Sequence, residues 1–308
     1  MIAPGTLLLA IETSNPSAIA DRGAGTDPGT DPGTGPGTGP GIGPGIGPGM
    51  GPGVAIGKNG STGLEILHAE ALRPVGRHED DLATCIDRCV SAGVGSASAN
   101  ARASIGLVVV SVGPGGYTAL RMACASGQMI ALANGARCVA VPTAGALAMS
   151  HVMHAAQTGG DARSLFPMAV ALAGKGDTAH VTVFSDAAKV RDPAACAAGR
   201  VVGPSEVGAM RLAILIADGH VPAALNAAAG QAGAKVLPPA FDPRALLELV
   251  AGASSWPDVD PALLVPLYAR EPEAVTLWRA RGGTASAYPF PVLTPESNPA
   301  FVPDQTSL

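Results

Sequence analysis

Apolar residues come in short runs along the chain, and most of these runs have the length of a buried β-strand. In the first half they are the run around Leu7–Ile11, the segment from Gly53 to Leu72 and the run from Ser104 to Val112. Apolar runs of about four to eight residues bounded by turn residues are typical of buried strands. The middle segment is expected to form two strands that turn at Lys58-Asn59-Gly60, because Asn-Gly favours a hairpin.

The second half of the chain repeats this kind of pattern. Strands are predicted in 165–174, 180–186, 199–203 and 211–219. A helix is predicted in 242–253, where an aspartate and a proline supply the usual start signals.

Two helices are predicted in the first half, and each has one distinctive face. The helix from Tyr117 to Asn134-Gly135 has a stripe of small residues, and the helix from His78 to Val90 has an apolar face with acidic residues in its first turn. The stripe consists of Ala119, Ala123, Ser126 or Gly127, and Ile130 or Ala131; the apolar face consists of Leu82, Cys85, Ile86, Cys89 and Val90. Such faces either receive another helix at close range or cover the chain's own sheet, and the sequence leaves both open.

The sequence Gly113-Pro114-Gly115-Gly116 joins the strand at 104–112 to the helix that starts at Tyr117. Gly113, Gly115 and Gly116 allow backbone conformations closed to other residues and bring amide groups close to a ligand or to a neighbouring backbone. The following helix N-terminus favours an anion. The segment lacks the lysine of a P-loop and the spacing of a dinucleotide fingerprint, so phosphate binding and a plain tight turn both remain open.

Gly-Pro pairs fill the segment from Gly23 to Gly53 in a four-residue period. Collagen requires glycine at every third position, so this tract is not collagen-like. It lies between two predicted strands and contains few apolar side chains. We therefore expect a disordered insertion at the tip of a hairpin, where extra length costs little.

Composition and charge narrow the possible functions. Hydrophobic residues make up 47% of the 308 residues, charged residues only 14%, and the net charge is −5, so a core is expected and direct capture of nucleic acid is not. The five cysteines show no CxxC pair, which favours a reducing cytoplasm over a disulfide framework. The start reads as a strand rather than a leader, and no run has the length of a membrane span.

His151 and His154 offer one enzyme hypothesis, because two histidines on one helix can ligate a metal. The alternative is that they pack as ordinary helical histidines. No HExxH, GxSxG or nearby acidic residue completes a site, so no metal site or catalytic residue is expected.

Several motifs, in order, resemble those of the TsaB proteins, also called YeaZ. They are LLLAIETS at the start, GRHEDDLATCIDRCV, SVGPGGYTALRMACASGQMIAL, CVAVPTAGALA and, near the end, LLVPLYAREPEA. The resemblance runs from about Leu7 to Ala274 apart from the Gly-Pro tract, and the third motif is the most specific.

This resemblance implies an α/β protein with the actin-like ATPase, or ribonuclease H-like, fold: two lobes, each with a mixed β-sheet. The corresponding domains are an N-terminal lobe at 1–156, with the insertion at 23–53, a second lobe at 157–278 and a tail at 279–308.

The resemblance also implies a function, that of a non-catalytic subunit in the formation of threonylcarbamoyladenosine in tRNA. The partner would be a catalytic TsaD-type homologue, joined by a TsaE-type ATPase, with tRNA contacted only indirectly and a homodimer formed when the partner is absent. Carried over residue by residue, the partner contacts would be Leu82, Cys85, Ile86 and Cys89 with Thr118, Arg121, Met122 and Ala125.

No cofactor is expected on the chain alone, while ATP or ADP at the interface with the catalytic partner is left open. The chain departs from an autonomous actin-like ATPase at IETSNPS, which has Glu12 and no glycine, and at ALAGKGDTAHV (171–181), which lacks the family's acidic residue and paired arginines. A stand-alone ATPase or kinase, or an enzyme like the M22 glycoproteases, is the alternative function.

Overall fold

The computed structural model describes residues 2–14, 50–73, 81–94, 104–251, 256–270, 277 and 281. Most of the Gly-Pro tract, His78 and all of the tail expected at 279–308 except residue 281 lie outside these residues. None of the described helices has the length and apolarity needed to span a bilayer.

The first sheet has five strands in the order β3-β2-β1-β4-β5. Its strands are β1 (Leu7–Glu12), β2 (Gly53–Asn59), β3 (Leu64–Ala71), β4 (Ile105–Gly113) and β5 (Arg137–Pro142). The pairs β1–β2 and β2–β3 are antiparallel, while β1–β4 and β4–β5 are parallel. Because Glu12 pairs with Gly53, the chain between them connects two adjacent antiparallel strand ends, as predicted for the insertion.

The second sheet has the order β10-β9-β6-β7-β8, which repeats the same scheme. Its strands are β6 (Met168–Lys175), β7 (Thr178–Phe184), β8 (Arg200–Val202), β9 (Ile214–Ala217) and β10 (Lys235–Leu237). Here β6, β7 and β8 are antiparallel neighbours, and β9 and β10 continue in parallel from β6. Two copies of this mixed topology make up the actin-like, ribonuclease H-like fold, so the predicted fold class is confirmed.

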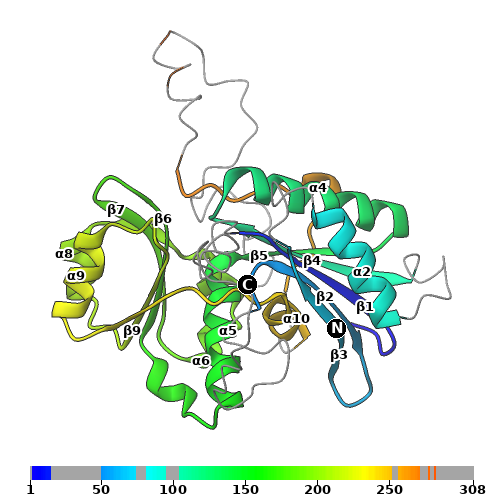
Figure 1. The fold of residues 1–308 in the computed structure, drawn as a ribbon, viewed down its shortest axis with the longest axis horizontal. Coiled ribbons are helices and arrows are strands. Elements are labelled where there is room, and N and C mark those ends of the chain that lie inside the picture. The colour runs from blue at the N-terminus through cyan, green and yellow to red at the C-terminus, as the bar shows by residue number, and fades with distance from the viewer. Residues whose placement is uncertain are drawn as a thin grey trace, which may run out of the picture.

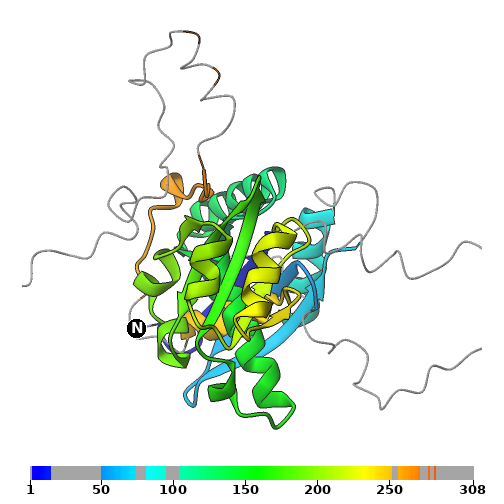
Figure 2. The ribbon, with the colours of Figure 1, turned by 90° about the vertical axis from the view of Figure 1, so that its left-hand side faces the viewer.

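Helices cover both sheets, and the layers can be followed in Figure 1. Helices α2 (Leu82–Val94) and α4 (Tyr117–Asn134) lie on the outer face of the first sheet, and α8 (Pro204–Ala209) and α9 (Ala223–Gln231) lie on the outer face of the second. The helices α5 (Thr143–Gln157) and α10 (Pro243–Ala251) lie between the two sheets. The short helices are η2 (Ala162–Leu165), α6 (Ala187–Val190), α7 (Pro193–Ala197) and η3 (Pro261–Leu263). Figure 2 shows α8 and α9 side by side on the outer face of the second sheet.

Alternation along the buried strands distributes side chains between these layers. In β1, Leu8 and Ala10 belong to the core between the sheets, whereas Leu9 and Ile11 belong to the core under α2 and α4. All four are fully buried. A strand that is covered on both faces is apolar throughout, which is why the sequence shows a continuous run here.

After β10 the chain returns to the first sheet. Helix α10 packs against β1 and β2, the Leu267 amide donates to the Val112 carbonyl at 2.7 Å, and the Arg137 guanidinium pairs with Asp258 at 2.7 Å. The division at residues 156 and 278 stays a prediction. Within the range predicted for the second lobe, α10, Asp258 and Leu267 contact the first sheet.

Candidate functional site

A buried polar cluster lies where β1, β4 and β5 end at the first sheet's carboxyl edge. The hydroxyl of Ser14 lies 2.7 Å from that of Ser111 and 2.6 Å from that of Thr143, and the last two are 2.9 Å apart. The Glu12 carboxylate accepts the Ser14 amide at 2.7 Å. All four residues are buried to 1% exposure or less, so the cluster supports the fold from inside.

Burial also affects the pKa of Glu12. Desolvation raises the pKa of this carboxyl above its ordinary value, although hydrogen bonds from Ser14 and Ser111 act in the opposite direction. Its second oxygen, Oε2, is buried without a hydrogen-bond partner among the described residues. A carboxyl that the protein encloses on all sides leaves no open position for a metal ion with a nucleotide.

The glycine turn after β4 packs against this cluster. The Gly116 amide donates to the Ser14 carbonyl at 2.6 Å, and a Cβ added to Gly115 would lie 2.1 Å from the same oxygen. Gly113 has a φ of 111°, in the region that favours glycine. The sequence left two roles open for this turn, phosphate binding and close packing against a neighbouring backbone. Gly115 and Gly116 pack closely against the Ser14 backbone, so the Gly116 amide is not available to a phosphate.

The apolar face of α2 is covered by the chain itself. The side chains of Leu82, Cys85, Ile86 and Cys89 are at most 8% exposed and belong to the core on the outer face of the first sheet. The thiols of Cys85 and Cys89 lie against strand carbonyls of Glu70 and Val54, and burial raises the pKa of both to about 12. The four side chains predicted as partner contacts on this helix thus pack against the chain's own sheet, as is usual for the apolar stripe of an amphipathic helix.

The small-residue stripe of α4 is covered in the same way. Ala119, Ala123 and Ala131 are at most 5% exposed, and a Cβ on Gly127 would lie 2.6 Å from the Val110 side chain. The stripe lets α4 lie close to β4 rather than to a second molecule, so the alternative in which it faces the chain's own sheet is the correct one.

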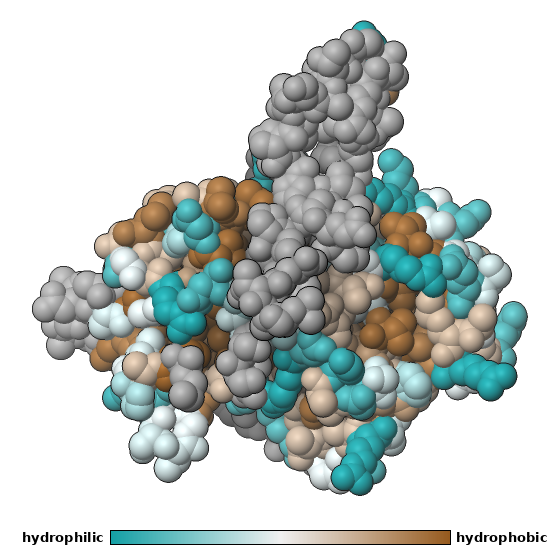
Figure 3. Space-filling model, turned by 180° about the vertical axis from the view of Figure 1, so that it is seen from behind, coloured by the Kyte–Doolittle hydropathy of each residue, from teal (hydrophilic) through white to brown (hydrophobic). Residues whose placement is uncertain are grey.

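The opposite face of α4 is exposed, and it holds the other four predicted contacts. Thr118, Arg121, Met122 and Ala125 are all exposed. Two residues that the sequence analysis did not select continue this face, Met129 at 71% exposure and Leu132 at 61%. Figure 3 shows hydrophobic residues exposed at the upper left of the molecule, on the half that holds the first sheet.

The spacing of this face is regular. Thr118, Met122, Ala125, Met129 and Leu132 follow one another at intervals of four, three, four and three residues, which aligns them along one side of a helix. We call these five residues the α4 stripe. The signal was present in the sequence, but α4 carries apolar residues on its buried side as well, so spacing alone did not show which side was free.

Aromatic contacts hold the N-terminal end of the stripe. The rings of Tyr117 and Tyr268 lie 5.4 Å apart, and the Arg121 guanidinium lies 4.8 Å from the centre of the Tyr117 ring. Arg121, which matches the most specific family motif, is thus positioned by a cation–π contact beside the exposed stripe.

Residues 75–208 match the model of a family described as "TsaD: tRNA N6-adenosine threonylcarbamoyltransferase". This range holds α2, the glycine turn and α4, and it covers just under half of the chain. No curated protein matches the chain.

Two solved structures from Pseudomonas aeruginosa are similar to the chain. One is titled as an uncharacterized protein with similarity to peptidase YEAZ; it is 15% identical, with a TM-score of 0.49, over 86% of this chain and 100% of that one. The other is titled YeaZ; it is 14% identical, with a TM-score of 0.49, over 85% of this chain and 99% of that one.

Proposed function

We propose that the chain is a non-catalytic subunit that pairs, through the α4 stripe, with a catalytic TsaD-type homologue in the formation of threonylcarbamoyladenosine in tRNA. The observation that carries this proposal is the exposed apolar side of α4, within the range that matches the TsaD family. Regularly spaced, exposed apolar side chains on a helix favour a partner that covers them.

The carboxyl edge of the first sheet favours a non-catalytic role for this chain. In an open α/β sheet, ligands bind outside this edge. Here Glu12, Ser14, Ser111 and Thr143 are buried, the three hydroxyls bond to one another, and the Gly116 amide donates to the Ser14 carbonyl. The reactive groups would therefore come from the catalytic homologue, with a TsaE-type ATPase as a further partner.

The charge of the chain supports only an indirect role for tRNA. Nineteen lysines and arginines stand against twenty-four acidic residues, and the net charge is −5. Tight binding to a phosphate backbone depends on clustered cations. The nucleic acid would thus contact the partner, and ATP or ADP would bind only in the complex.

The substitution Met129→Arg tests the pairing. Met129 is 71% exposed, so the change leaves the fold intact, but a charged group in the centre of an apolar contact loses its solvation. We expect affinity for the purified TsaD-type homologue from the same organism, measured by isothermal titration calorimetry, to fall at least about thirtyfold, or about 2 kcal/mol.

Val183→Arg is the matched control, because Val183 is also an exposed apolar residue, at 43%, but lies on β7 in the second sheet. It should leave the affinity unchanged. Equal binding by wild type and Met129→Arg, or ATP hydrolysis by the isolated chain at an ordinary enzymatic rate, would contradict the proposal.

A further inference from the structure

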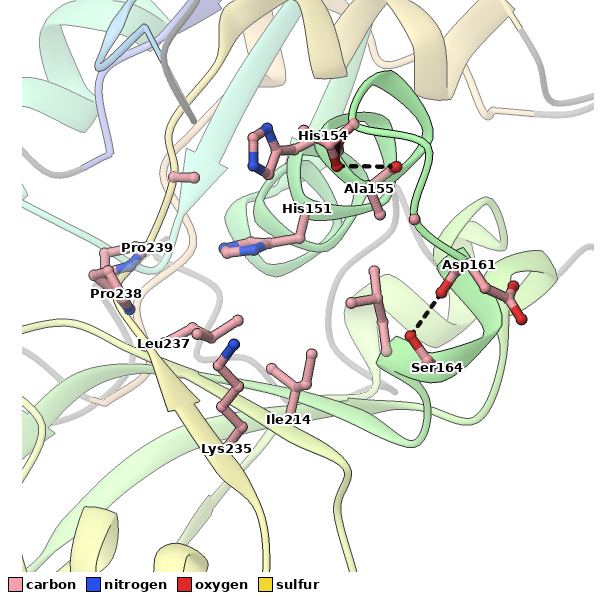
Figure 4. A pocket seen from close by; sticks show the side chains of 14 residues that line it. His151, His154, Ala155, Asp161, Ser164, Ile214, Lys235, Leu237, Pro238 and Pro239 are labelled. Carbon is pink, nitrogen blue, oxygen red and sulfur yellow. Dashed lines mark hydrogen bonds between the residues drawn. The ribbon is translucent and has the colours of Figure 1, made fainter. Parts of the chain in front are cut away.

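A cavity of about 430 Å³ lies between the end of α5 and the edge of the second sheet. Its walls come from the second half of α5, from η2 and from β9, β10 and the loop that follows β10. Figure 4 shows this space with His151 and His154 on one side and Lys235, Leu237 and Ile214 on another. The volume accommodates a small organic molecule.

One cation enters the cavity. The Lys235 amine points from β10 into the space that also receives the His151 ring (Figure 4). It forms no ion pair with a carboxylate of the described part of the chain. The acidic wall residue, Asp161, points away from the cavity and caps η2 by accepting the Arg163 amide at 2.9 Å. The cavity thus offers a positive charge without an internal counter-ion.

The two histidines add polar groups to the cavity wall, and His151 adds no charge. Burial, with His154 nearby, lowers the pKa of His151 to about 4, although the Pro238 backbone acts in the opposite direction. His151 is therefore neutral at pH 7. The described residues contain no group of three or more histidine, cysteine, aspartate or glutamate side chains that is able to hold a metal, so the metal hypothesis for the two histidines lacks the further ligands it needs.

The remaining walls are largely apolar. They include Leu165, Ile214, Leu237, Pro238 and Pro239. A ligand that fills such a space needs an apolar body together with an anionic end that reaches Lys235. A single flexible ammonium group matches one negative charge; a phosphate dianion prefers an arginine fork or several backbone amides, and the cavity shows neither.

We propose that this cavity binds a small monocarboxylic acid with an apolar body, its carboxylate on Lys235 and its body against Ile214, Leu237 and the two prolines. This site is separate from the proposed pairing surface: the cavity lies at the end of α5 and the edge strand β10, and the stripe lies on the outer face of the first sheet. The proposal therefore stands or falls independently of the proposed function.

Fluorine NMR with the isolated chain and para-trifluoromethylphenylacetate as the probe tests the proposal. We expect saturable binding of this acid and weaker binding of the matching uncharged amide. Lys235→Met should weaken binding of the acid about fivefold and leave the amide unaffected, because only the acid loses its charge partner. Lys235→Arg should restore the preference for the acid.

Lys58→Met is the matched control, since Lys58 is an exposed lysine at the end of β2 in the first sheet. It should bind the acid as the wild type does, and the acid should shift the ring signals of His154. No saturable binding by the wild type, equal losses in Lys235→Met and Lys58→Met, or equal affinity for acid and amide would overturn the proposal.

Discussion

Gly115→Ala is expected to destabilise the protein by about 3 kcal/mol, because the added methyl group has no room. Its Cβ would lie 2.1 Å from the Ser14 carbonyl oxygen and 2.8 Å from the carbonyl carbon, and both are backbone atoms at the end of a buried strand. Relief requires the turn to move away from β1, which lengthens the 2.6 Å hydrogen bond from Gly116 to Ser14 and displaces the start of α4. Urea unfolding of the purified variant measures the loss.

Gly230→Ala is the control with the opposite sign. Gly230 lies within α9, and nothing lies within 4 Å of the position that its Cβ would take. Alanine should therefore stabilise the protein by up to about 1 kcal/mol, since glycine is a poor helix former. A Gly115→Ala protein as stable as the wild type would show that the turn is not packed against Ser14 as described.

Acid should destabilise the protein well before its carboxylates lose their charge, because two histidines are buried in the neutral form. His180 is 5% exposed, and burial lowers its pKa to about 4, although the Gly199 backbone acts in the opposite direction. Burial lowers the pKa of His151 to about 4 as well. An unfolded chain protonates histidine near pH 6.5, so the stability that these two rings contribute is present above that pH and is lost as the pH falls toward 4.

The expected loss is about 2.5 kcal/mol for each ring between about pH 7 and about pH 4.5. Urea unfolding across this range should show it, and His180→Gln, which stays neutral, should remove about half of the pH dependence. Burial raises the pKa of Glu12 and Asp218, so these carboxyls protonate first in the folded state and oppose the loss at the acid end. A free energy of unfolding that is constant over this range, or a His180 ring that titrates near pH 6.5 in NMR, would contradict the expectation.

Helix α4 shows how far the sequence alone predicts the structure. Its bounds, Tyr117 to Asn134 with Gly135 in the left-handed conformation as the cap, were predictable from local signals. The sequence did not predict which face of the helix would be exposed. Both the small residues, such as Ala123 and Gly127, and the larger ones, such as Met122 and Met129, recur at helical spacing. Only the small-residue face was selected from the sequence by its spacing, and spacing alone does not show which face is exposed.

The same limit applies to α2 and to the cavity. Leu82, Cys85, Ile86 and Cys89 form a clear apolar face, but that face is equally suited to a partner and to the chain's own strands. His151 and Lys235 are 84 residues apart in sequence (235 − 151), and no local pattern connects them. Their meeting depends on the return of the chain along the edge of the second sheet.

Local patterns in the sequence predict many of the elements: buried strands as continuous apolar runs, three helices with their start or stop signals, a glycine corner after β4 and an insertion between β1 and β2. These depend on interactions between near neighbours, which hydrophobic spacing and backbone preference report directly. Other features became clear only in the folded chain. They are the coverage of the helix faces, the return of α10 to the first sheet, the hydrogen bond from the Gly116 amide to the Ser14 carbonyl, and the lysine and two histidines that line one cavity. Each of these outcomes is a competition between distant segments for the same buried surface, and it is settled by close packing of the whole chain.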